Sequence, residues 1–333
     1  MKKVLFIGGT GTISGACAAS AAANGFDVTV LNRGRASIAM PGVKNITADI
    51  NDEAAAAGLI KDMDFDVVAD FIAFTPEQAE RSIRLFSGRT DQYIFISSAS
   101  VYQKPLSYSV ITEGTPLANP YWQYARDKIA IEERLMREYR DNGFPVTIVR
   151  PSHTYGDRSI PVCLHGAKGS FQVVKRILDG KAVIVPGDGT TWWTVTHNTD
   201  FAKGFIGLMG NPHAIGEAFH ITSDESLTWN MIYDIIGRIL GKKTVKLHVS
   251  TDMLCKFDPG WEGGLTGDKC VSVRFDNSKI KRTVPDFNAV TRFDQGAART
   301  LEHILSHPEC QVPDPEFESV CDRIVSAAEH FGI

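Results

Sequence analysis

Residues 8–15 of the chain read GGTGTISG, and they stand between the apolar run KVLFI (residues 3–7) and an alanine-rich run that begins at Ala16. Four of these eight residues are glycine, which lets a chain turn tightly and lets a ligand approach the backbone where a Cβ atom would block it. The alanine-rich run has the composition of a helix, and the first N–H groups of a helix attract anions. The stretch therefore predicts a strand, a tight turn and a helix that together hold an anionic ligand.

The first half of the chain repeats this alternation of strand and helix. Its strand-like runs are apolar at nearly every position, which is typical of parallel strands buried on both faces of a sheet. Strands that alternate with helices in this way predict an α/β fold with a Rossmann-type, doubly wound parallel sheet. The expected strands are 3–7, 27–31, 43–47, 65–74, 92–98 and 144–151, and the expected helices are 11–24, 51–61, one from about 76, and 121–141.

The glycines follow the spacing Gly8-x-x-Gly11-x-x-Ser14-Gly15, with Ser14 where the dinucleotide-binding fingerprint has its third glycine. Taken alone, the motif also fits a plain strand–helix connection. Its place between a strand and a helix, and a second strand that ends about 20 residues later, favour a dinucleotide site.

The end of that second strand reads LNRGR and bears on the choice of cofactor. An acidic residue there would bind the ribose 2′-hydroxyl of NAD(H), but the position is Asn32 and is followed by Arg33. A neutral residue with an arginine suits the 2′-phosphate of NADP(H), and Arg35 and Ser37 are close enough in sequence to add contacts. We expect NADP(H), with NAD(H) as the alternative because Arg33 also fits as a solvated or adenine-stacking side chain.

The pattern of strands and helices changes after about Tyr155. Residues 161–189 predict a helix and a strand, residues 217–222 predict one more strand, and the glycine-rich residues 260–268 predict a flexible loop. The last third of the chain has shorter helices. We expect a dinucleotide-binding domain at 1–155 with 190–222 returning to it, and a smaller, interleaved C-terminal substrate-binding domain at 156–189 and 223–333.

Composition narrows the class of protein. The 333 residues carry a net charge of −4 and a pI near 6.1, which is not the basic balance of a nucleic-acid-binding protein. The six cysteines are scattered without zinc-ligand spacing, and His165, His197 and His220 show no such spacing either, so we expect no metal. No apolar run reaches the length of a membrane span. We expect a soluble cytoplasmic protein with no nucleic-acid or membrane partner.

The run YWQYARDK (residues 121–128) contains the candidate catalytic pair. Tyr124 and Lys128 are four residues apart on an expected helix, so both side chains lie on one face. A lysine ammonium beside a phenol favours the phenolate and lowers the tyrosine pKa. About 25 residues earlier the strand run ends in serines, among them Ser98. A tyrosine–lysine pair alone also fits a helix surface, but its combination with the glycine motif and the serines indicates a catalytic site.

With these motifs the chain resembles the extended short-chain dehydrogenase/reductase family, which includes NAD(P)-dependent nucleotide-sugar epimerases and dehydratases. By that resemblance, Tyr124 is the general acid/base, Lys128 lowers its pKa and binds the nicotinamide ribose, and Ser98 holds the reacting hydroxyl or carbonyl. The resemblance rests on GGTGTIS, ADI (48–50), DFIAF (70–74), SSASVY (97–102), Tyr124-x-x-x-Lys128, VRPSHTYG (149–156) and PGDG…HNTDFA (186–202).

The same resemblance implies a wider set of binding residues. The implied cofactor site consists of Gly8, Thr10, Gly11, Thr12, Ile13, Asn32, Arg33, Asp49, Ile50, Phe71, Ile72, Ala73, Ser97, Lys128, Pro151, Ser152 and His153. The candidate substrate residues are Ser100, Trp122, His153 and Trp193. Trp122, Trp192 and Trp193 fit either a pocket wall or the core, and His153 fits either a substrate contact or a structural histidine.

Several positions depart from the family pattern. Ala99 and Ser100 stand where the dehydratases carry an Asp–Glu pair, so we do not expect dehydration. His153 stands where epimerases that act on UDP-galactose carry an asparagine, and Trp193 and Leu265 stand where they use arginines on the diphosphate. The loss of charge-assisted contacts weakens the case for a nucleotide-sugar substrate.

Two enzymatic hypotheses follow, and a third belongs to another class. The chain is either an epimerase-like enzyme that moves a hydride at a carbinol or keto carbon of a sugar-like substrate, or a ketone reductase or alcohol dehydrogenase that acts on a non-nucleotide substrate. The third hypothesis is a dinucleotide- or RNA-binding regulatory protein, as in chloroplast stem-loop-binding relatives. The family often pairs through a four-helix interface, so a homodimer through helices 76–86 and 121–141 is one expected assembly.

Overall fold

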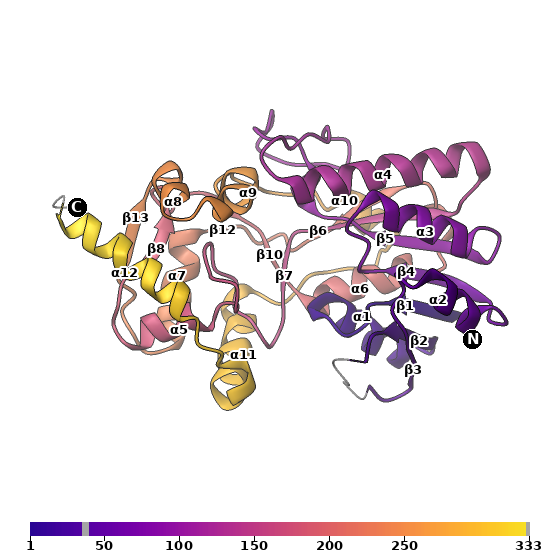
Figure 1. The fold of residues 1–333 in the computed structure, drawn as a ribbon, viewed down its shortest axis with the longest axis horizontal. Coiled ribbons are helices and arrows are strands. Elements are labelled where there is room, and N and C mark those ends of the chain that lie inside the picture. The colour runs from indigo at the N-terminus through magenta and orange to yellow at the C-terminus, as the bar shows by residue number, and fades with distance from the viewer. Residues whose placement is uncertain (35–39, 331–333) are drawn as a thin grey trace.

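A parallel β-sheet organises the N-terminal part of the molecule (Figure 1). The computed structural model describes residues 1–34 and 40–330, and within these ranges seven strands form the sheet in the order β11-β6-β5-β4-β1-β2-β3. The chain thus extends the sheet first on one side of β1 and then on the other, which confirms the predicted doubly wound fold. The strands are β1 (Lys3–Ile7), β2 (Asp27–Asn32), β3 (Val43–Thr47), β4 (Phe65–Asp70), β5 (Thr90–Ile96), β6 (Val146–Pro151) and β11 (Ala218–Ile221).

Helices cover both faces of this sheet (Figure 1). Successive residues of β1 point to opposite sides: Val4 and Phe6 pack with α1 and α6, whereas Leu5 and Ile7 pack with α2, α3 and α4. This is why the strand runs are apolar at every position rather than alternating. The helices are α1 (Thr12–Ala23), α2 (Glu53–Ile60), α3 (Pro76–Phe86), α4 (Gln123–Asn142) and α6 (Asn198–Leu208).

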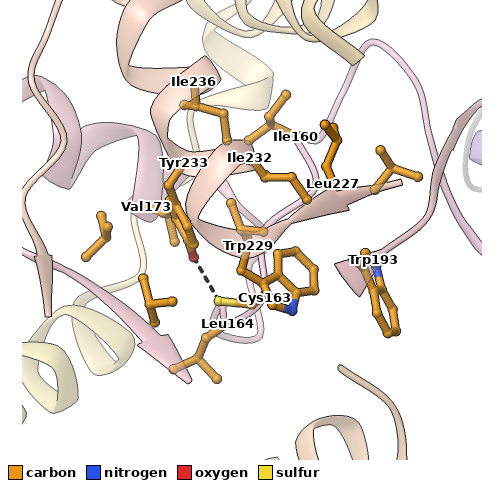
Figure 2. Packing of buried hydrophobic residues seen from close by; sticks show 14 of the residues in the cluster. Ile160, Cys163, Leu164, Val173, Trp193, Leu227, Trp229, Ile232, Tyr233 and Ile236 are labelled. Atoms are coloured by element: carbon orange, nitrogen blue, oxygen red, sulfur yellow. Dashed lines mark hydrogen bonds between the residues drawn. The ribbon is translucent and has the colours of Figure 1, made fainter. Parts of the chain in front are cut away.

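A second group of elements packs around its own cluster of buried side chains (Figure 2), in which Trp229, Tyr233 and Val173 take part. Figure 2 also shows the Tyr233 hydroxyl directed at the Cys163 thiol, 3.1 Å away. The elements of this group are α5 (Phe171–Leu178), β8 (Val183–Pro186) with β13 (Lys246–Val249), β9 (Trp192–Trp193) with β12 (Leu227–Thr228), α7 (Trp229–Ile239), α8 (Thr251–Phe257), α11 (Phe293–Ser306) and α12 (Pro315–His330).

The two groups are interleaved along the chain. The pair β7 (His153–Tyr155) and β10 (Val195–His197) lies between them in Figure 1. The helix α10 (Ser278–Thr283) belongs by sequence to the predicted substrate-binding domain, yet Ile280 packs in the cluster beneath α1 and α6. The division into two domains stays a prediction. No helix in the described ranges is long and apolar enough to cross a membrane.

Two predicted strands differ in detail from the structure. The expected strand 65–74 ends at Asp70, because the Asp70 carboxylate accepts a hydrogen bond from the Ile72 N–H (2.9 Å) and turns the chain. The strand β3 lies at the edge of the sheet, and its residues are exposed or half-buried rather than covered on both faces. Its sequence VKNIT has two polar residues in the middle, which is consistent with an edge.

The glycine-rich segment 260–268 is helical, so the expectation of a flexible loop is wrong. A short 3₁₀ turn (Pro259–Trp261) leads into α9 (Glu262–Gly264) and a π-helical turn (Leu265–Lys269). Its glycines allow close packing: a Cβ on Gly263 would lie 2.3 Å from Trp122 Cδ1. The Asn119 side chain adds a hydrogen bond from Nδ2 to the Gly267 carbonyl (2.7 Å). The small residues therefore dock this segment against Trp122.

Replacing Gly263 by alanine tests this packing. The added methyl group would push Trp122 or the helical segment aside, and we expect Gly263→Ala to lower the free energy of unfolding by about 1–3 kcal/mol. The matched control is Gly264→Ala, since a Cβ there meets no atom within 4 Å. Denaturant unfolding should leave Gly264→Ala unchanged or slightly more stable, because alanine favours helix. Equal stability of the two variants would show that the segment is not packed in this way.

Candidate active site

The glycine turn forms a cradle at the carboxyl end of β1. Gly8 has a φ of +87°, and a Cβ there would lie 2.4 Å from Ile72 Cγ2, so no other residue fits. Ser14, which replaces the third glycine of the fingerprint, orders the turn: its Oγ donates to the Gly8 carbonyl (2.6 Å) and accepts from the Gly11 N–H (2.9 Å). The helix α1 then begins at Thr12 with no side chain at its N-cap. Its first-turn N–H groups remain available to a ligand.

The other predicted cofactor residues line up along the same edge of the sheet. Phe71, Ile72 and Ala73 follow β4 directly. Ser97 follows β5, and its buried Oγ has no hydrogen-bond partner among the described residues. Ile50 is buried at the turn after β3. The carboxyl ends of parallel strands meet at one edge, so the topology brings these segments together with the glycine turn.

Asn32 and Arg33 lie at the end of β2. The Asn32 side chain is already engaged, because its Oδ1 accepts a hydrogen bond from the Gly34 N–H (2.8 Å). The exposed Arg33 side chain makes no hydrogen bond or ion pair with any described residue. Arg35 and Ser37 lie outside the described residues.

Lys128 is buried between α4 and the sheet. Its Nζ donates to the Ala73 carbonyl (2.7 Å) and to the Ile96 carbonyl (2.8 Å), and it lies 4.7 Å from the centre of the Phe95 ring. Burial lowers the Lys128 pKa to about 8, although the charges of Asp70 and Glu132 oppose the shift. Two of the three ammonium hydrogens are therefore bonded to the segment after β4 and to the end of β5, and the third is left for a ligand.

Tyr124 lies one helical turn before Lys128, beside Ser98. Ser98 Oγ accepts hydrogen bonds from the N–H (3.2 Å) and the Oγ (2.9 Å) of Ser100, which leaves its own hydrogen for the tyrosine. Burial raises the Tyr124 pKa, the hydrogen bond with Ser98 lowers it, and the charge of Asp268 raises it. The expected lowering by Lys128 is not found, because the ammonium is directed at two backbone carbonyls instead.

A cavity of about 270 Å³ opens in front of Tyr124. It brings together the predicted catalytic residues Ser98 and Tyr124 with the predicted substrate residues, whereas Trp192 is 43% exposed and lies outside its lining. The lining residues are Ser98, Ala99, Ser100, Trp122, Tyr124, Pro151, Ser152, His153, His165, Trp193, Asp268, Lys269, Val273 and Phe275. Pro151, Ser152 and His153, predicted to contact the cofactor, thus stand on the wall of this cavity.

His153 is held by a tryptophan. The Trp193 Nε1 donates to His153 Nδ1 (3.2 Å), and the buried Trp193 ring stacks on Trp229 with ring centres 5.3 Å apart. Figure 2 shows the two indoles side by side. Burial, together with the positive charge of Lys269, lowers the His153 pKa to about 3. The histidine is therefore neutral at physiological pH.

Asp268 and Lys269 are site residues that sequence reasoning missed. They stand on the π-helical turn that packs against Trp122, a conformation that often marks functional sites. Burial raises the Asp268 pKa, while the charges of Lys104 and Lys269 oppose that shift. The sequence carries no clear signal for a helix here, because a glycine-rich run favours a loop.

The arrangement combines a phenol for proton transfer with hydrogen-bonding groups for an oxygen-bearing substrate. Ser98 and Tyr124 face one cavity, and Lys128 lies behind them at the same sheet edge as the glycine cradle. Within the described residues no three histidine, cysteine, aspartate or glutamate side chains are grouped so that they could hold a metal ion.

Comparisons with known proteins agree with this geometry. A family model described as the NAD dependent epimerase/dehydratase family matches residues 4–222, more than half of the chain. Among solved structures, the epimerase Mth375 of Methanothermobacter thermautotrophicus is similar over 92% of this chain and 93% of that chain, with a TM-score of 0.77 and 17% identity. That likeness establishes a shared fold.

Two curated relatives extend the comparison. The 2′-dehydrokanamycin reductase of Streptomyces kanamyceticus is 24% identical over 242 residues, which are 72% of this chain and 67% of the relative. The chloroplast stem-loop binding protein of 41 kDa b from Arabidopsis thaliana is 26% identical over 243 residues, which are 69% of this chain and 61% of the relative. The alignments thus leave about a third of each relative uncovered.

The neutrality of His153 predicts a specific pH dependence of stability. Its pKa falls from 6.5 to about 3 on folding, so between these values the unfolded chain binds more protons and stability declines as the pH drops. In His153→Gln this contribution is absent. Between pH 7 and pH 4.5 we expect the unfolding free energy of wild type to fall by about 2 kcal/mol more than that of the variant, measured by urea denaturation. Parallel declines would mean that folding leaves the pKa of His153 unchanged.

Proposed function

The chain belongs to the NAD dependent epimerase/dehydratase family, and on that premise we propose that it transfers a hydride between NAD(P)(H) and a carbinol or keto carbon of a sugar-like substrate. The observation that carries the proposal is the placement of Ser98, Tyr124 and Lys128 at one sheet edge beside a cavity, next to the glycine cradle. A phenol, a serine hydroxyl and an ammonium that lie close together suit proton transfer to a substrate oxygen.

The residues present fit a dinucleotide. The positive φ at Gly8, the open N-cap of α1 and the unpartnered buried Ser97 hydroxyl together form a backbone cradle with free donors. Lys128 keeps one ammonium hydrogen for a ribose hydroxyl. When bound, the nicotinamide supplies the hydride chemistry that side chains lack.

Within this proposal Tyr124 moves the proton. In the oxidising direction its phenolate takes the proton of the substrate hydroxyl, and in the reducing direction its phenol returns a proton to the carbonyl oxygen. When substrate is bound, the Ser98 hydrogen turns from Tyr124 to the same oxygen and holds it near the phenol. The Tyr124 pKa is raised in this structure, so the phenol form is favoured, and that form serves the reduction of a ketone.

Two versions of this chemistry fit the same residues. An epimerase-like enzyme returns the hydride to the other face of its keto intermediate, whereas a reductase releases the product and exchanges the cofactor. The relative named 2′-dehydrokanamycin reductase supports the second version, and the matching epimerase fold supports the first. The absorbance of reduced nicotinamide distinguishes them, because it changes with net turnover only in a reductase.

The likeness to a chloroplast stem-loop binding protein supports RNA binding as a second candidate function. Against it stand a net charge of −4, the place of Tyr124 on a cavity wall and the burial of Lys128, since neither residue is presented on an open surface. A homodimer through α3 and α4 also stays a proposal. The two helices pack together, and the ion pair of Arg134 with Glu80 links them.

The phenol is tested by Tyr124→Phe. We expect turnover of any substrate to fall at least 100-fold while dinucleotide binding, measured by calorimetry, stays within about twofold, because only the transferable proton is lost. The matched control is Tyr121→Phe, since Tyr121 is 43% exposed, lies two residues before α4 and is outside the cavity lining. Undiminished turnover in Tyr124→Phe would refute the acid/base role.

The preference for NADP(H) is proposed from Arg33, an exposed guanidinium with no described partner at the end of β2. A charge-assisted hydrogen bond to a 2′-phosphate contributes about 1.5–3 kcal/mol, which corresponds to roughly 10- to 100-fold in affinity. In Arg33→Ala we expect NADP(H) binding to weaken by about that factor and NAD(H) binding to stay nearly unchanged. Equal affinities for both cofactors in wild type, or an equal loss for both in the variant, would rule out the preference.

A further inference from the structure

We propose that the cavity takes a compact, polyhydroxylated ring without a phosphate group, and that His153 and Asp268 are the residues that select it. This inference rests on the proposed function, because it names the substrate class of the same site. It is argued from the hydrogen-bond partners of the two histidines that line the cavity, the charges on the wall and the size of the space.

The hydrogen on His153 is placed by its partner. An indole nitrogen can only donate, so the bond from Trp193 Nε1 makes His153 Nδ1 an acceptor and puts the hydrogen of the neutral ring on Nε2. His165 has the opposite arrangement: its Nδ1 lies 2.8 Å from the Gly166 carbonyl, which can only accept, so its neutral ring offers Nε2 as an acceptor. The two histidines of the lining therefore carry one fixed donor and one fixed acceptor, a combination that suits hydroxyl groups.

The charged groups on the wall form a balanced pair. The side chains of Asp268 and Lys269 make no hydrogen bond or ion pair with any described residue, and they carry opposite charges. A carboxylate has two oxygens that can accept from neighbouring hydroxyls of a ring. A diphosphate instead needs several charge-assisted donors, and among the described residues the cavity lining contains no arginine and only one lysine, which stands next to the carboxylate.

The dimensions agree with a single ring. The cavity measures about 270 Å³, below the range of roughly 300–1,000 Å³ that is usual for drug-sized ligands. Trp122, whose ring centre lies 4.9 Å from that of Tyr124, lines the space next to the phenol and offers an apolar surface to the C–H face of a ring. The space thus fits a monosaccharide or cyclitol placed against Tyr124.

Binding to Tyr124→Phe, loaded with NADP⁺, tests the substrate class separately from the reaction. The probes are D-glucose, D-galactose and myo-inositol, compared with UDP and UDP-glucose, and the readout is the ¹⁵N shift of the His153 ring together with calorimetry. We expect at least one phosphate-free probe to shift the His153 signals in the millimolar range and the two nucleotides to leave them unchanged. Binding of UDP or UDP-glucose below about 100 µM, or no response to any phosphate-free probe, overturns the inference.

Trp193→Phe tests the role of the fixed donor, with Trp192→Phe as the matched control. The phenyl ring keeps the stacking on Trp229 but cannot donate, so the His153 tautomer becomes mixed and binding of the responding polyol should weaken about three- to tenfold. Trp192→Phe should change neither the tautomer nor the binding. An unchanged tautomer in Trp193→Phe overturns the assignment. If polyols bind but wild type transfers no hydride to or from them, the proposed function fails while the substrate class stands.

Discussion

The buried ammonium of Lys128 is the interaction on which the site depends. It joins α4, on one face of the sheet, to two backbone carbonyls. One is the carbonyl of Ala73 in the segment after β4, and the other is that of Ile96 at the end of β5. A buried charge is tolerated only where its hydrogen bonds are satisfied, so this side chain helps to fix the position of α4 against the sheet. Because Tyr124 lies one turn away on the same helix, the position of the phenol follows from the burial of the lysine.

The same interaction changes what the lysine does to the tyrosine. The expected effect, a lowered phenol pKa, assumes that the ammonium is directed at the hydroxyl. Here two of its hydrogens are bound by backbone oxygens, and burial is the largest influence on the Tyr124 pKa. Motif spacing places the two residues on one face of a helix. It does not say which acceptors the ammonium will meet, because these come from strands far away in the sequence.

Much of the fold could be predicted from the sequence, because short stretches of residues determine it. The turn at Gly8, the apolar strands and the Tyr124–Lys128 spacing each have a short-range pattern. The cavity wall is different. Asp268 and Lys269 come from a glycine-rich segment that its sequence predicts as a loop, and only the packing against Trp122 explains its helical form. The hydrogen bond between His153 and Trp193 joins residues that are 40 positions apart. Such contacts depend on the packing of segments that lie far apart in the sequence.

The stacked indoles of Trp193 and Trp229 have a mechanical consequence. Trp193 holds His153, while the Nε1 of Trp229 donates to the Lys269 carbonyl (2.9 Å), so the stacked indoles join two parts of the cavity wall. These two parts of the wall cannot move apart unless the two indole rings unstack. The cavity is therefore preformed and does not close around its ligand, so a ligand that enters it orders few side chains. Such a preformed cavity selects among ligands by how well their shape fits it, and not by rearranging its side chains around them.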